Sequence, residues 1–153
     1  MSTDHRRRSH HGEQHGQDGI AVGLRAAVTA EVTDADTAIA LGSGDVPVLG
    51  TPRLLALAEA ASVAAVTPQL AAGQTTVGTA VSLEHSRPSP LGTQVEVQAE
   101  LTAVDGRRLT FMFIAYGPGE GDDSVIGAGT VVRAVVDRDK FVSRAHATGQ
   151  DPG

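Results

Sequence analysis

One segment of helical pattern, residues 51–66, lies among segments whose apolar residues alternate. It opens with Thr51-Pro52, where Thr51 is expected as the N-cap and Pro52 as the first helical residue. Ala, Leu and Val then follow on nearly every side, until Pro68 and Gly73 end the pattern. A helix that is apolar all round is buried. The sequence therefore predicts a single buried helix at the centre of a β-rich domain.

Five other segments carry strand patterns, either alternating apolar residues or one long apolar run. Two of them flank Asp105-Gly106, a pair favoured at the centre of type I′ hairpin turns, and should pair antiparallel. The last segment, 125–136, is apolar on both faces, which indicates a strand near the middle of the sheet. The five segments begin at or near Val22, Val77, Val95, Leu109 and Val125. The predicted fold is α+β, an antiparallel sheet of about five strands wrapped around one central α-helix.

The chain divides into a tail, one domain and a second tail. Residues 1–19 hold four histidines and a run of three arginines but no large apolar residue after the first Met, so a disordered tail is expected. Nothing there orders the histidines, and no metal site is expected. Residues 20–142 form the predicted domain, and residues 143–153 are polar and are expected to be a flexible tail.

Composition excludes several classes of protein. The absence of cysteine removes disulfide scaffolds, thiolate metal sites and cysteine nucleophiles. An aromatic content of 3% and a net charge of -6 argue against a nucleic-acid partner and an anionic membrane surface. No apolar run is long enough to span a membrane, and no apolar segment follows the first residues. A cytoplasmic protein without a membrane or nucleic-acid partner is expected.

Two ionisable residues interrupt the apolar pattern of the predicted core. Glu59 shares a helical stripe with Leu55 and Val63, and His85 extends the alternating face that begins at Val77. A buried carboxylate and an imidazole can form a general acid–base pair. There are alternatives. Glu59 could lie on a side of the helix that faces solvent or another subunit, and His85 could be a hydrogen-bonded core residue.

Arg133 is a third charged residue in an apolar setting, inside the run Gly127 to Val136. Its alternative interpretation is an arginine at the surface end of a strand.

One helix covers only one side of a five-stranded sheet, and a strand that is apolar on both faces needs further cover. A homodimer is therefore predicted.

These residues and motifs resemble the hotdog-fold thioesterase superfamily, and within it the fluoroacetyl-coenzyme A thioesterase family, over residues 20–142. The similarity lies in Thr51 just before the central helix, Glu59 eight residues later and His85 at the end of the next strand. The segments Val77 to His85, Val104 to Leu109 and Gly127 to Arg133 also resemble family motifs and bring Gly78 and Arg133 into the site. The family has aromatic lid residues before the helix, whereas residues 34–50 contain no aromatic residue.

The resemblance implies an acyl-CoA thioesterase that hydrolyses a small acyl-coenzyme A thioester without a cofactor. Glu59 would be general base or nucleophile, His85 would carry the proton to the leaving thiol, and Thr51 would orient Glu59 or the acyl group. The backbone at Gly78 would stabilise the oxyanion. Arg133, together with Arg107 and Arg108, would bind coenzyme A phosphates or hold the site together. A non-catalytic acyl-CoA or small-ligand binding protein is the main alternative, and a hydratase ranks third.

Overall fold

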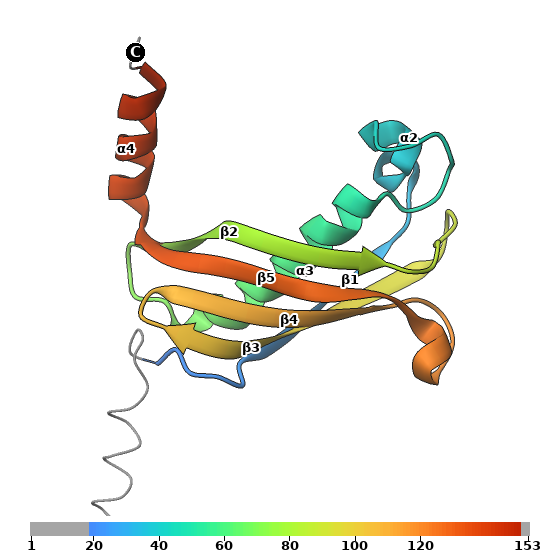
Figure 1. The fold of residues 1–153 in the computed structure, drawn as a ribbon, viewed down its shortest axis with the longest axis horizontal. Helices are drawn as coiled ribbons and strands as arrows, with labels where there is room; N and C mark the ends of the chain where they lie inside the picture. Colours follow the sequence, from blue (N-terminus) through green and yellow to red (C-terminus); the bar gives the residue numbers. More distant parts are fainter. Residues whose placement is uncertain (1–18, 151–153) are drawn as a thin grey trace, which may run out of the picture.

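The computed structural model describes residues 19–150 and contains one five-stranded antiparallel sheet, ordered β1-β3-β4-β5-β2. Figure 1 shows helix α3 behind the strands and helix α4 projecting from one end of the sheet. The strands are β1 (Arg25–Glu31), β2 (Gln74–His85), β3 (Gln94–Asp105), β4 (Arg108–Tyr116) and β5 (Val125–Asp137). The helices are α2 (Ala38–Leu41), α3 (Thr51–Val66) and α4 (Arg138–Gln150), with short 3₁₀ turns at Asp34–Asp36, Thr67–Gln69 and Gly121–Ser124. The predicted α+β fold is confirmed.

Helix α3 has the predicted bounds and fills the inner face of the sheet. Its small and branched side chains meet the aromatic rings of β4, and Leu54, Ala58 and Phe111 are all fully buried. The N-cap differs from the prediction, because Gly50 occupies that position and α3 begins at Thr51. The Thr51 hydroxyl makes no capping bond and is therefore available for another partner.

The strand β2 contains a bulge. Gly78 pairs with Arg133 and Ala80 with Val132, so Thr79 is an extra residue on β2. Side-chain alternation changes phase there: Thr76 and Gly78 share the inner face before the bulge, whereas Leu83 and His85 share it afterwards. The prediction that Val77 belongs to the same face as His85 was therefore wrong.

The hairpin between β3 and β4 is confirmed, with a different turn from the one predicted. Asp105 pairs with Arg108, so the two central residues are Gly106 and Arg107. Gly106 has φ +62°, and no non-glycine residue in the described part of the chain has a positive φ. A positive φ at the first central position alone is the pattern of a type II′ turn rather than type I′.

The two ends of the chain differ in what the structure describes. The segment 143–153, expected as a flexible tail, is helical as far as Gln150, because α4 continues directly from β5. The predicted N-terminal tail, including its four histidines, falls almost entirely outside the described residues. Within residues 19–150, no helix is long and apolar enough to cross a membrane. The same residues contain no cluster of three His, Asp or Glu side chains suited to a metal ion.

Candidate active site

The first turn of α3 is joined to the end of β2 by a side-chain hydrogen bond. Thr51 Oγ1 and His85 Nδ1 lie 2.8 Å apart, although the two residues are 34 positions apart in sequence. The other ring nitrogen of His85, Nε2, is buried and has no hydrogen-bond partner among the described residues. When the imidazole is neutral and donates from Nδ1 to Thr51, Nε2 presents a lone pair that can accept a proton.

Burial controls the charge of His85. Desolvation lowers the pKa of the imidazole below its ordinary value of 6.5, because the charged form loses its water, and a backbone hydrogen bond with Arg87 opposes this in part. His85 is therefore neutral at pH 7. A neutral imidazole can take up a proton during a reaction and then release it, as an acid–base group must.

Two turns further along α3, the Glu59 carboxylate is held by an arginine from β5. Arg133 Nη1 donates to Glu59 Oε2 at 3.0 Å, and the Arg133 side chain is 10% exposed whereas that of Glu59 is 36% exposed. The other two nitrogens of the guanidinium donate to Thr76: Nε to its Oγ1 at 2.8 Å and Nη2 to its carbonyl oxygen at 3.0 Å. Arg133 is thus fixed by protein groups and orients Glu59.

Gly78 provides the space that this carboxylate occupies. A Cβ atom at Gly78 would lie 2.6 Å from Glu59 Oε2 and 3.3 Å from Arg133 Nη1, and the first distance is shorter than any normal contact. Only glycine at this position allows the carboxylate to lie directly against the backbone of β2. The adjacent bulge interrupts the β2–β5 ladder at the same place.

The structure therefore arranges the five predicted site residues in two groups. Thr51 contacts His85, and Glu59 contacts Gly78 and Arg133. Among the described residues, no hydrogen bond or ion pair joins Glu59 to His85. Eight residues of α-helix rise about 12 Å, so Thr51 and Glu59, and with them the two groups, are separated by about two turns along α3. Arg107 and Arg108 lie in the β3–β4 turn, at the other end of β5 from His85.

Thr76 is a site residue that sequence reasoning missed. It is 8% exposed and makes two of the three hydrogen bonds that fix Arg133. A buried threonine is unremarkable in a strand, and the alternation assigned its neighbour Val77 to the inner face. The bulge at Thr79 reverses that assignment, and the neighbouring Gly78 is the sequence signal that could have indicated it.

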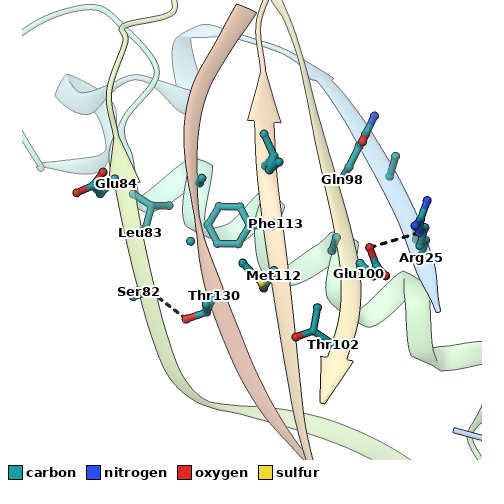
Figure 2. Close-up of a pocket in the computed structure, with 16 residues that line it drawn as sticks. Arg25, Ser82, Leu83, Glu84, Gln98, Glu100, Thr102, Met112, Phe113 and Thr130 are labelled. Carbon is teal, nitrogen blue, oxygen red and sulfur yellow. Dashed lines mark hydrogen bonds and ion pairs between the residues drawn. The ribbon is translucent and has the colours of Figure 1, made fainter. Parts of the chain in front are cut away.

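A wide groove lies elsewhere in the molecule. It has a volume of about 1010 Å³ and is lined by residues from all five strands, but it contains neither Thr51, Glu59 nor His85. Figure 2 shows its side chains, with a hydrogen bond from Ser82 to Thr130 on one side and an ion pair from Arg25 to Glu100 on the other. This groove is on the face of the sheet opposite α3 and is not part of the candidate site.

The chain resembles known thioesterases in sequence. Residues 32–139 match the family model described as fluoroacetyl-CoA-specific thioesterase. A fluoroacetyl-CoA thioesterase from Streptantibioticus cattleyicolor is 40% identical over 94 residues, which cover 61% of this chain and 65% of that protein. The aligned part is thus slightly less than two thirds of the relative's length.

Solved structures show the same relationship. A variant of the fluoroacetyl-CoA thioesterase in complex with acetyl-CoA has a TM-score of 0.77 and 30% identity, over 84% of this chain and 98% of that one. Another structure of that enzyme gives a TM-score of 0.75 and 33% identity, over 88% of this chain and 100% of the other. A thioesterase superfamily member from Thermus thermophilus has a TM-score of 0.78 at 22% identity, over 88% of this chain and 96% of that one, which supports the fold alone.

Proposed function

The chain belongs to the fluoroacetyl-CoA-specific thioesterase family, and we propose that it hydrolyses a small acyl-coenzyme A thioester between its two groups of site residues. The observation that carries the proposal is that α3 and β2 together hold a neutral histidine, fixed by Thr51, and a carboxylate that lies against Gly78. The curated relative acts on fluoroacetyl-CoA, and a solved relative was captured with acetyl-CoA. Both are short acyl esters.

In the proposed reaction, Glu59 removes a proton from water as the water oxygen attacks the thioester carbonyl carbon. The oxyanion that forms is stabilised by backbone N–H at or near Gly78, where the ladder is interrupted. The tetrahedral intermediate collapses, the C–S bond breaks, and a proton passes through His85 to the thiolate. The products are a carboxylic acid and coenzyme A.

Direct attack by the Glu59 carboxylate is the other route open to the same residues. It would form an acyl-glutamyl anhydride with loss of coenzyme A, and water would then hydrolyse the anhydride. Label found on Glu59 after a single turnover in ¹⁸O-labelled water would identify the anhydride route, because only attack of water on the glutamyl carbonyl of the anhydride leaves the label on the enzyme. General base catalysis would place all of the label in the released acid.

Thiol release from a panel of short acyl-coenzyme A esters tests the proposed activity. We expect release by the native chain and its loss in Glu59→Gln. Glu31→Gln, the same change on an exposed residue of β1, is the matched control and should retain activity. Binding of the esters without release would identify a non-catalytic binding protein instead, and hydration of an enoyl ester would identify a hydratase.

A homodimer formed through β2 is part of the proposal. This strand lies at one edge of the sheet, and its central residues Gly78 to Ser82 are exposed and carry no charge. Val81 faces inward beside the buried Val131 yet remains 46% exposed. An uncharged, exposed edge strand is a template for pairing with another chain. Sedimentation should give a dimer at micromolar concentration, and Val81→Lys should weaken it.

The proposed substrate also fits a cytoplasmic location, where acyl-coenzyme A esters are made and consumed. Cell fractionation with a tagged full chain tests this location. Recovery of the protein outside the cytoplasmic fraction would contradict it.

A further inference from the structure

Helix α4 has no partner within the described part of the chain for most of its length. It leaves the sheet where Arg138 N donates to Gly73 O at 2.9 Å, and Figure 1 shows it extending past the free edge of β2. Every described side chain on α4 is exposed, including Phe141 at 38% and Val142 at 49%. A helix of this length is only marginally stable alone in water, so its apolar side chains call for a packing partner.

The helix combines an apolar face with positive charge. Phe141, Ala145 and Thr148 follow the spacing of one helical face and border a shallow hollow of about 430 Å³. Arg138, Lys140 and Arg144 carry positive charge and form no ion pair among the described residues, and Asp139 is the only acidic residue of α4. A fitting partner would be acidic with some exposed apolar surface.

The far end of the same molecule has those properties. The exposed carboxylates at the His85 end of the sheet, here termed the acidic end, are Glu84 of β2 and Glu120, Asp122 and Asp123 of the β4–β5 loop. Only Asp123 has an ion-pair partner among the described residues, the Arg87 side chain at 3.6 Å. Val46 and Leu91, at 50% and 45% exposure, add apolar surface to this end.

Helix α4 does not reach the acidic end of its own chain. It begins beside the Gln74 end of β2, whereas the acidic end lies beyond His85. Twelve residues of strand span about 36 Å, and thirteen residues of helix span about 20 Å. In a dimer, the acidic end of a second copy of the chain can lie closer to α4. When two β2 strands pair antiparallel about a two-fold axis, the Gln74 end of one lies beside the His85 end of the other.

We propose that α4 of each protomer docks on the acidic end of the other protomer and forms one wall of the approach to its Thr51–His85 pair. The inference rests on the dimer proposed above. The basic side chains of α4 face Glu120 and Asp122 of the other copy, while Phe141 and Val142 cover exposed apolar surface there. The site of each protomer is then completed by its partner.

Two charge-reversed proteins test this docking. The helix-reversed protein carries Lys140→Glu and Arg144→Glu, and the loop-reversed protein carries Glu120→Lys and Asp122→Lys. All four positions are exposed, so both proteins should fold. In either homodimer the reversed positions meet charges of their own sign across the proposed contact, and we expect the dimer Kd to rise at least about tenfold, a change of about 1.4 kcal/mol.

Mixing the two proteins provides the decisive measurement. In the heterodimer both contacts again join opposite charges, so sedimentation of the mixture should show a dimer with a Kd within about threefold of the native one. Absence of this rescue would overturn the proposal, because a contact within one chain cannot be restored by mixing. Arg25→Glu and Glu31→Lys, charge reversals on β1 at the opposite edge of the sheet, are the matched controls and should leave the Kd unchanged.

The outcome is independent of the proposed activity. If α4 instead bound the phosphates of coenzyme A, the helix-reversed protein would remain a tight dimer and only its KM would rise, which would overturn the docking. A native chain that sediments as a monomer would overturn it as well. Rescue by mixing in a protein that hydrolyses no acyl-coenzyme A ester would refute the proposed function and support the docking.

Discussion

The hydroxyl of Thr51 and the Nδ1 atom of His85 lie 2.8 Å apart and join the start of α3 to the end of β2. The bond leaves Nε2 as the ring atom that can exchange a proton with a substrate. Helix α3 then carries Glu59 about two turns away. Helix α3 and strand β2 thus contribute residues to both groups of the candidate site, and β5 adds Arg133 to the second.

Glu59 and His85 are expected to act as one catalytic unit. Glu59→Gln and His85→Ala should each lower kcat about a hundredfold or more, and the double variant should be little worse than the poorer single variant. Glutamine at position 59 can still accept the Arg133 hydrogen bond, so thermal unfolding should change little. Variants that unfold easily but keep native specific activity while folded would show that the two residues are structural.

Thr51 should matter through its hydroxyl alone. Thr51→Val keeps the branched shape but removes the partner of His85 Nδ1, and kcat should fall about tenfold or more. Thr51→Ser restores the oxygen and should recover most of the activity. The hydrogen bond is exposed, so the stability lost in Thr51→Val should stay below about 1.5 kcal/mol. Equal activity of the two variants would remove Thr51 from the site.

Gly78→Ala should damage activity more than stability. The new Cβ would meet the end of a flexible side chain, Glu59 Oε2 at 2.6 Å, so the carboxylate would move and the backbone would stay in place. We expect kcat to fall at least about tenfold with a nearly native melting curve. Gly129→Ala is the contrasting variant, since its Cβ would collide with the backbone carbonyl oxygen of Ser82 and must disturb the sheet.

Arg133→Lys separates two possible roles of this arginine. Lysine retains the charge but cannot reproduce the fork that contacts both Thr76 and Glu59. If Arg133 orients Glu59, kcat should fall with little change in KM. A rise in KM with kcat unchanged would instead indicate that Arg133 contacts the coenzyme A phosphates. Steady-state kinetics with one short acyl ester distinguishes the two outcomes.

His85 should make stability depend on pH below neutrality. Its pKa is lowered by burial in the folded protein, so between that value and 6.5 the unfolded chain binds a proton that the folded chain does not. The contribution of His85 is therefore fully present above pH 6.5 and decreases as pH falls through this window. Urea unfolding of the native chain and of His85→Gln at several pH values should show a steeper loss for the native chain. Parallel curves would contradict the prediction.

The fold was largely predictable because its strongest determinants are local. A uniformly apolar helix, five segments with strand patterns and a glycine at one hairpin turn are visible along the chain, and the helix bounds were correct. The N-cap at Gly50 was missed because threonine and glycine both occur at N-cap positions, and Thr51 as N-cap would place Pro52 at the first helical position. Helix α4 was missed because a fully exposed helix has the polar composition of a tail.

The contacts of the site were harder to predict than its residues. Glu59, His85 and Arg133 were recognised as ionisable residues in apolar surroundings, but periodicity does not say which of them meet. The pairing of Thr51 with His85 depends on where α3 crosses β2, which is a tertiary property. The role of Thr76 depends on a bulge that shifts the strand by one residue.

Because of that bulge, the side chains of β2 alternate in one register before Thr79 and in the opposite register after it. A one-residue shift of register between β2 and β5 before the bulge would turn Thr76 and Gly78 away from α3. The pairing of Leu83 and His85 with β5, which lies after the bulge, would stay the same. The contacts of Glu59 and those of His85 therefore depend on opposite halves of one strand, and the bulge allows each half to keep its own register against β5.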